Sequence, residues 1–147
     1  MVERHKTALT RYELSKPVKS LLEYGLLTST TSFFDYGCGQ GSDVRGLKGL
    51  GHEADGWDPV HRPDGQKHHA DIVNLGYVLN VIEDPAERVE AVRRAFELTR
   101  SVMSVGVMLY GNDITGRPYL DGYRTSRNTF QKYFTQQEFK DYLEQIL

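Results

Sequence analysis

The sequence predicts an α/β domain with a Rossmann-like, doubly wound and mostly parallel sheet. Short apolar runs alternate with segments of helical periodicity from Phe33 onward, as expected for βαβ units. The first apolar run leads into a turn with three glycines, FFDYGCGQGSD (33–43). The length of 147 residues suits one domain, and 39% hydrophobic with 26% charged residues is typical of a globular protein.

The first half of the chain contains two predicted helices and two predicted strands. A helix is expected from Pro17, because Val18, Leu21 and Leu22 recur at helical spacing and Gly25 can end it. TSFFDYG follows as a buried strand. After the glycine turn, residues 42–50 are expected to form a short helix, and EADGWDP is the second strand candidate.

The second half is expected to continue the alternation. ADIVNLGYVLNVIED (70–84) begins as a buried strand, and its continuation into a helix stays open. Pro85 begins the clearest helix, whose inward stripe includes Phe96 and whose wet face includes Arg88. SVMSVGVMLY (101–110) is predicted as a strand buried on both faces. Residues 111–128 are predicted as a long loop, and QQEFKDYLEQIL closes the chain as a helix.

Composition excludes several classes of protein. The net charge is −2, from 18 basic and 20 acidic residues, so no global basic field indicates nucleic-acid binding. The single cysteine, Cys38, excludes an internal disulfide and a four-cysteine zinc site. His52, His61, His68 and His69 have no recognised ligand spacing, so no metal site is predicted. Without a signal peptide or an apolar run long enough to cross a bilayer, the expected location is cytoplasmic.

The glycine turn indicates a ligand other than a common dinucleotide. Gly37, Gly39 and Gly41 follow a G-x-G-x-G spacing, which differs from the G-x-G-x-x-G fingerprint, and no Gly-Lys-Ser/Thr of a P-loop is present. Asp35 would repel a pyrophosphate and suits a ligand with a cation near the turn. A turn with a purely structural role is the less favoured alternative, because three glycines cost conformational entropy without a gain in packing.

This pattern resembles motif I of the class I S-adenosylmethionine-dependent methyltransferases, and the resemblance extends from Phe33 to Tyr110. It implies that the turn receives the amino acid part of S-adenosylmethionine while the motif I acid orients its ammonium group. An acid at the end of the second strand would bond the ribose hydroxyls. The cofactor-binding candidates are therefore Asp35, Gly37, Cys38, Gly39, Gly41, Asp58, Pro59, Asp71 and Asn74. Cys38 is expected to be a small buried spacer.

Two departures from that family are expected to reduce the sheet. Only a short segment separates Asp58 from Asp71, so the third strand is vestigial or missing. The chain stops in a helix, so the C-terminal sixth and seventh strands are absent and the sheet edge needs a cover. The expected organisation is an N-terminal helical segment (1–32) and an S-adenosylmethionine-binding domain (33–147), as part of a longer chain.

The methyl acceptor depends on a weaker pattern, NLGY. Amino-methyltransferases acting on adenine or cytosine carry Asn/Asp-Pro-Pro-Tyr/Phe at this place, and Asn74 and Tyr77 match its outer positions, which makes them the catalytic candidates. A strand-end polar group and a packing aromatic are the alternative. The aromatic and basic segment after Tyr110 supplies the substrate-binding candidates Arg117, Tyr123, Arg124 and Arg127. A solvated lid is its alternative, and residues 4–17 have the same ambiguity.

Whole segments also resemble a narrower family, the methyltransferases associated with bacterial DNA phosphorothioation. They include VERHKTALTRYELSKP, FFDYGCGQG, GWDPVHRP, ADIVNLGYVLNVIEDPAER and TSRNTFQKYF. The resemblance implies DNA modification, with DNA or RNA, the remainder of a longer chain or other modification proteins as partners, and no membrane. The expected function is S-adenosylmethionine-dependent methylation of a nucleic-acid base amine. A non-catalytic cofactor-binding or regulatory module and a small-molecule methyltransferase are the alternatives.

Overall fold

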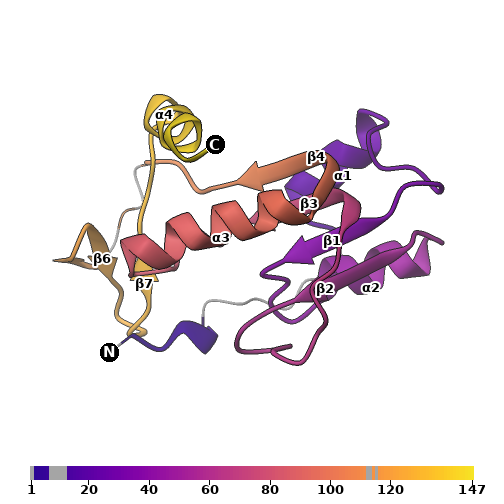
Figure 1. The fold of residues 1–147 in the computed structure, drawn as a ribbon. Helices are drawn as coiled ribbons and strands as arrows, with labels where there is room; N and C mark the ends of the chain where they lie inside the picture. The colour runs from indigo at the N-terminus through magenta and orange to yellow at the C-terminus, as the bar shows by residue number, and fades with distance from the viewer. Residues whose placement is uncertain (1, 7–12, 112–113, 115) are drawn as a thin grey trace.

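The main sheet has four parallel strands. The computed structural model describes residues 2–6, 13–111, 114 and 116–147, so residues 7–12 of the expected N-terminal segment lie outside the described part. The strands are β1 (Phe33–Tyr36), β2 (Ala54–Trp57), β3 (Ala70–Gly76) and β4 (Thr99–Gly106), in the order β2-β1-β3-β4 (Figure 1). The prediction of an α/β domain with a mostly parallel sheet is confirmed at this level.

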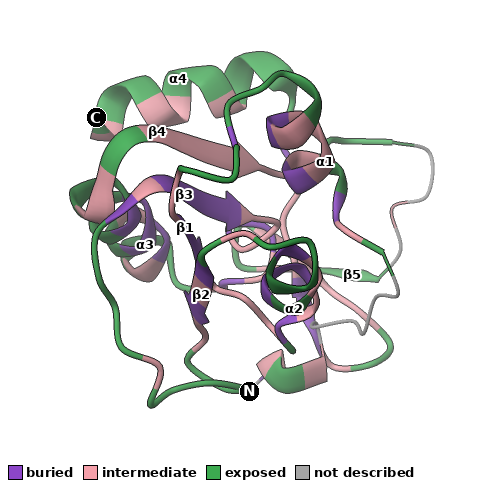
Figure 2. Cartoon of the chain, turned by 90° about the vertical axis from the view of Figure 1, so that its right-hand side faces the viewer, coloured by how far each residue is buried: buried purple, intermediate pink, exposed green. Residues whose placement is uncertain are grey.

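Helices cover both faces of this sheet (Figure 2). The helices α1 (Lys16–Glu23) and α2 (Ser42–Gly49) pack against one face, where Val18, Val44 and Ile72 share a buried cluster. The other face carries α3 (Pro85–Leu98) and α4 (Gln136–Ile146), with Val92 against Val73. Both strand-facing clusters contain aromatic residues of β1, so the central strand is buried on both sides.

The helix boundaries follow local signals. In α3 the Asp84 carboxylate accepts a hydrogen bond from the Ala86 amide and Pro85 is the first residue, as the Asp-Pro pair predicts. In α4 the Thr135 and Glu138 side chains form a reciprocal capping box. After β3 the chain does not continue as a helix. Residues 77–84 form a loop, which Asn80 holds by accepting from the Met108 amide and donating to the Lys132 carbonyl.

β4 differs from its prediction in length and burial. It begins at Thr99 and ends at Gly106, and its residues are half-buried or exposed, whereas a strand buried on both faces over 101–110 was predicted. The reason is its position at the end of the strand order, where only one neighbouring strand shields it. Continuous apolar character therefore identified a strand but not its depth in the sheet.

The predicted loop contains a second, smaller sheet. Within the described residues, β5 (Arg117–Tyr119), β6 (Gly122–Arg124) and β7 (Phe130–Gln131) pair antiparallel in the order β5-β6-β7, while 112, 113 and 115 lie outside the described part. This sheet explains why Arg88 is buried although a wet position was predicted. Its guanidinium makes two 2.6 Å bonds to Asp121 and a 2.6 Å bond to the Ile82 carbonyl. Phe96, predicted to face inward, is 51% exposed.

No third strand forms between β2 and β3. Residues 58–69 are all described, and they form turns with one isolated bridge between Asp58 and Arg62. The short segment holds no helix either, so β2 is an edge strand. Among the helices of the described residues, none has the length and apolar character to cross a membrane.

Candidate functional site

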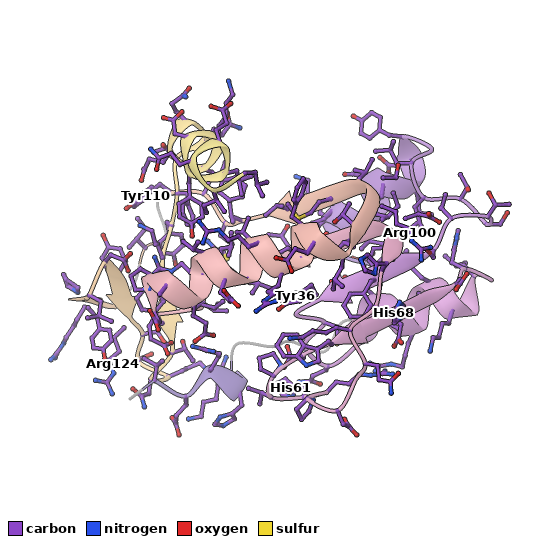
Figure 3. The ribbon with its side chains drawn as sticks, in the orientation of Figure 1. Tyr36, His61, His68, Arg100, Tyr110 and Arg124 are labelled. Carbon is purple, nitrogen blue, oxygen red and sulfur yellow. The ribbon has the colours of Figure 1, made fainter. Side chains whose placement is uncertain are left out.

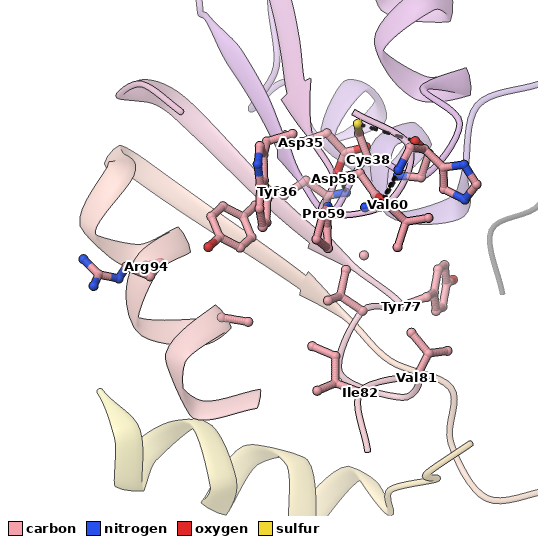
Figure 4. Close-up of a pocket in the computed structure, with 18 of the residues that line it drawn as sticks. Asp35, Tyr36, Cys38, Asp58, Pro59, Val60, Tyr77, Val81, Ile82 and Arg94 are labelled. Carbon is pink, nitrogen blue, oxygen red and sulfur yellow. Dashed lines mark hydrogen bonds between the residues drawn. The ribbon is translucent and has the colours of Figure 1, made fainter. Parts of the chain in front are cut away.

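A pocket of about 580 Å³ lies at the carboxyl ends of β1, β2 and β3 (Figure 4). Its walls come from the glycine turn, the segment after β2, the loop after β3 and one flank of α3, which includes Glu90, Ala91 and Arg94. Figure 4 shows Cys38, Asp58 and Val60 on one side and Val81 and Ile82 across from them. Parallel sheets bind ligands at this end, where strand order reverses around the first strand.

The glycine turn requires glycine for its backbone shape. Gly37, Gly39 and Gly41 have φ angles of 87°, 55° and 84°, in the left-handed region that residues with a Cβ avoid. A Cβ on Gly37 would also lie 2.5 Å from Val78 Cγ2. The amides of Gly37 and Cys38 donate to the Trp57 carbonyl at 2.7 and 2.9 Å, which ties the turn to the end of β2.

Asp58 is held in a defined orientation beside this turn. Its Oδ2 accepts from the Gly39 amide at 3.0 Å, and its Oδ1 accepts from the Val60 and His61 amides at 2.9 Å each. A carboxylate oxygen has two lone pairs, so the group keeps acceptor capacity for a ligand that enters the pocket. Asp58 thus presents a fixed negative charge to the pocket, as predicted from its place after the second strand.

Asp35 and Asn74 form a buried polar pair on neighbouring strands. Their Cα positions are in register between β1 and β3, and Asn74 Nδ2 donates to Asp35 Oδ1 at 3.1 Å. Asp35 is 5% exposed and Asn74 is 1% exposed. Asn74 Oδ1 is buried, and no group of the described residues hydrogen-bonds to it. Such orphaned acceptors are rare in folded proteins, and this one belongs to a side chain that lines the pocket.

Most of the predicted cofactor-binding residues meet in this pocket. Its lining includes Asp35, Gly37, Cys38, Gly39, Asp58, Pro59 and Asn74, together with the predicted catalytic residue Tyr77. Tyr77 has a φ of 59°, an uncommon conformation for a non-glycine residue, and its amide donates to the Gly106 carbonyl. Strained aromatic residues of this kind are concentrated at ligand sites.

Two predicted cofactor residues lie outside the lining. Asp71 is near the start of β3, at the amino end of the sheet, where its Oδ2 accepts from the Ser32 amide and hydroxyl at 2.9 and 3.1 Å. These bonds lower its pKa and explain its position structurally. Gly41 is the residue before α2 and opens that helix in a left-handed conformation. The structure thus places Asp71 and Gly41 outside the lining of the pocket that gathers the other candidates.

The predicted substrate-binding residues also lie away from the pocket. Arg117, Tyr123 and Arg124 belong to the small sheet, and Arg127 is exposed in the turn before β7. The Arg124 guanidinium lies 5.5 Å from the Tyr119 ring centre, and its Nε donates to Asn128 Oδ1 at 2.6 Å. Figure 3 shows Arg124 far from Tyr36. The structure places these residues on a surface that is separate from the pocket. In the sequence they were grouped only because basic and aromatic residues alternate in this segment.

Several lining residues escaped the sequence analysis. They are Tyr36, Trp57, Lys67, Val78, Val81, Ile82, Glu90 and Arg94. Tyr36 and Trp57 were detectable in principle, because each is the last residue of a strand and immediately precedes a predicted site segment. Glu90 and Arg94 of α3 were not detectable. No local signal in the sequence shows that the missing third strand leaves this helix beside an open pocket.

Cys38 is expected to be chemically inert. Burial, with Asp35 and Asp58 nearby, raises the pKa of its thiol to about 12. At about pH 8 the reactive thiolate is then roughly a thousandfold scarcer than for an unperturbed thiol of pKa near 9. We expect iodoacetamide to label Cys38 at least a hundredfold more slowly than the exposed thiol of a Ser101→Cys variant. Its rate should still rise above about pH 10. Intact-mass spectrometry over time measures both rates, and equal rates would contradict the burial.

The geometry thus joins two carboxylates, a left-handed glycine turn and an orphaned amide oxygen in one pocket. Within the described residues, no three His, Cys, Asp or Glu side chains converge as a metal site. His68 instead contacts Asp55 at 3.2 Å, and His52 contacts the Thr28 carbonyl at 3.1 Å. In comparisons with protein-family models and with curated proteins, nothing matches this chain.

Proposed function

We propose that this chain is a class I-like methyltransferase that binds S-adenosylmethionine in the pocket beside the glycine turn. One observation carries the proposal: a turn that only glycine can form lies between two ordered carboxylates, Asp35 and Asp58, at the carboxyl ends of parallel strands. The same placement supports a Rossmann-like reading of the four-stranded sheet.

The residues present fit the cofactor. A Cβ at Gly37 would fill the turn, and the acidic side of the pocket suits an ammonium and a sulfonium group. Asp58 offers acceptor capacity to ribose hydroxyls. Asn74 Oδ1 offers a buried acceptor to an N–H donor, either on the cofactor or on the methyl acceptor.

The chain itself contributes positioning and exclusion of water. When bound, S-adenosylmethionine supplies an electrophilic methyl group: the acceptor lone pair forms the new bond to carbon while the carbon–sulfur bond breaks, leaving a neutral thioether. Val81 and Ile82 line the opposite wall of the pocket and reduce the water that reaches the reacting atoms. An amine acceptor held by Asn74 would lose its extra proton to water, so no general base is required.

One observation favours a small-molecule methyl acceptor over a base within a nucleic acid. The basic and aromatic residues expected to hold a nucleic acid do not line the pocket. Association with DNA modification therefore stays a proposal from the resemblance. Transfer of a labelled methyl group distinguishes the two functions. Label in DNA or RNA indicates methylation of a base amine at Asn74, and label in free metabolites indicates methylation of a small molecule.

Calorimetry with S-adenosylmethionine and S-adenosylhomocysteine tests the cofactor directly. We expect Asp35→Asn to weaken both ligands about tenfold or more, because a buried charge partner of the ammonium group is lost. Asp71 lies near the amino end of β3, away from the pocket, so Asp71→Asn should leave both affinities unchanged. Absence of binding to the unaltered chain would refute the proposal. Binding without any methyl transfer would instead identify a cofactor-binding module.

A further inference from the structure

The pocket continues from the glycine turn onto the face of the sheet that α3 covers. Tyr36 and Trp57 are paired residues of β1 and β2, and both side chains join the cluster on the α3 face. Asp35 precedes Tyr36 on β1, and Asn74 is in register with Asp35 on β3. Both side chains therefore lie on the opposite face of the sheet from Tyr36. One continuous pocket thus reaches the two carboxylates and the two aromatic rings.

We call the second part the aromatic trough, formed by Tyr36, Trp57, Lys67, Arg94 and Leu98. The rings of Tyr36 and Trp57 lie 5.0 Å apart with an interplanar angle of 48°. The segment between β2 and β3 places no helix over this face, and Lys67 of this segment lies over the two rings. In Figure 3, Tyr36 lies between α3 and the strands.

Lys67 differs from the other cationic side chains of the pocket lining. Its ammonium lies 3.8 Å from the Trp57 ring centre and 5.3 Å from that of Tyr36, and within the described residues it has no carboxylate partner. Arg94 contacts Glu90 at 2.8 Å and Glu97 at 3.6 Å, and Arg4 contacts Glu83 and Glu87. The positive charge of Lys67 is thus the one that a ligand can use without breaking an ion pair.

The two ends of the pocket differ in charge: the turn end is acidic, whereas the trough combines the Arg94 ion pairs with Glu90 and Glu97 and the Lys67 ammonium, which has no carboxylate partner among the described residues. Asp35 and Asp58 make the turn end favourable for a sulfonium and an ammonium group. In the trough Trp57 is half-buried and Tyr36 is 5% exposed, so the accessible aromatic surface belongs to Trp57, with the Lys67 ammonium over its ring. An anionic substituent can draw this ammonium to itself while its planar ring takes the place on Trp57.

We propose that the aromatic trough binds the methyl acceptor, and that the acceptor is a planar ring compound with a carboxylate or phosphate group that pairs with Lys67. This inference rests on the proposed methyltransferase function. The ring packs against Trp57 in place of the Lys67 ammonium, and the anion pairs with that ammonium and fixes the direction of the ring, so that a nucleophilic ring substituent points to the turn end. The acceptor atom gains the methyl group and the cofactor sulfur keeps the electron pair of the broken bond.

Trp57 is the single tryptophan of the chain, so its fluorescence reports this trough alone. The probes are two matched pairs, uridine monophosphate with uridine and para-hydroxyphenylacetate with tyramine, titrated with saturating S-adenosylhomocysteine. We expect each anionic probe to quench Trp57 with at least tenfold higher affinity than its neutral or cationic partner. The nucleotide and the aromatic acid distinguish the phosphate from the carboxylate source of the anion.

Lys67→Gln should remove this preference while leaving calorimetric binding of S-adenosylhomocysteine unchanged, and Lys140→Gln, on the exposed surface of α4, should change neither. The inference would be overturned if the anionic probes bound no more tightly than their neutral or cationic partners. It would also be overturned if the anionic probes quenched Trp57 undiminished in Lys67→Gln. Failure of the cofactor to bind would refute the proposed function, and the probe titrations without cofactor would still decide whether the trough binds planar anions.

Discussion

Gly37→Ala is expected to abolish measurable S-adenosylmethionine binding and to lower the thermal stability of the chain. The added Cβ would lie 2.5 Å from Val78 Cγ2, and the φ of 87° is strained for any residue with a side chain. The conformational strain alone is about 1–3 kcal/mol. Relief by movement of Val78 would displace the wall of the pocket. Calorimetry for the cofactor and a thermal melt measure the two effects.

Gly49→Ala is the matched control for that experiment. Gly49 is the last residue of α2, and a Cβ there meets no atom within 4 Å. Alanine in a helix is favoured over glycine by roughly 0.5–1 kcal/mol, so this variant should melt at an equal or higher temperature and bind the cofactor normally. A Gly37→Ala/Val78→Ala double variant separates the clash from the backbone strain. If it binds as the unaltered chain does, the turn does not require glycine.

Asn74→Asp is expected to destabilise the chain in a pH-dependent manner. The substitution replaces the Nδ2 donor, 3.1 Å from Asp35 Oδ1, with a second carboxylate oxygen in a buried site. Two such groups cannot both be charged there, so the folded state must hold a proton that the unfolded chain releases at neutral pH. The free energy of unfolding should therefore fall as the pH rises, by about 3 kcal/mol or more at about pH 8 relative to the unaltered chain.

Urea unfolding at about pH 5 and at about pH 8 measures that dependence. Asn74→Leu removes the same amide without adding a second carboxyl group, so its loss of stability should grow less between the two pH values than that of Asn74→Asp. An Asn74→Asp variant whose deficit against the unaltered chain is the same at both pH values would contradict the contact with Asp35. The experiment does not involve a cofactor, so its result is independent of the proposed function.

The order of strands and helices was predictable because its signals are local. Pro85 after Asp84 and the capping residues at Thr135 act within one turn of a helix. The glycine turn was equally readable, since left-handed backbone excludes most other residues. Asp58 was found as the acid at the end of a predicted strand; the structure ends β2 one residue earlier, at Trp57, and places Asp58 at the pocket.

Depth and direction were not predictable from local patterns. Arg88 has the spacing of an exposed helix position, yet its guanidinium is buried and bonds to Asp121, which the turn between β5 and β6 brings to it and which itself stays exposed. Asp71 has the composition of a site residue, but it lies near the amino end of β3, away from the ligand end. β4 carries Val102, Met103 and Val105 and still forms an edge, because no further strand pairs with it in the described sheet.

The sequence by itself determined the parallel α/β order, the glycine turn and the two carboxylates beside it, because each depends on backbone conformation within a few residues. Only the tertiary structure decided which of those residues share a pocket. It also revealed the trough of Tyr36, Trp57 and Lys67. This surface forms where residues 58–69 hold no helix and where α3 packs on the neighbouring strands. Such a surface depends on contacts between distant segments, which periodicity along the chain does not encode.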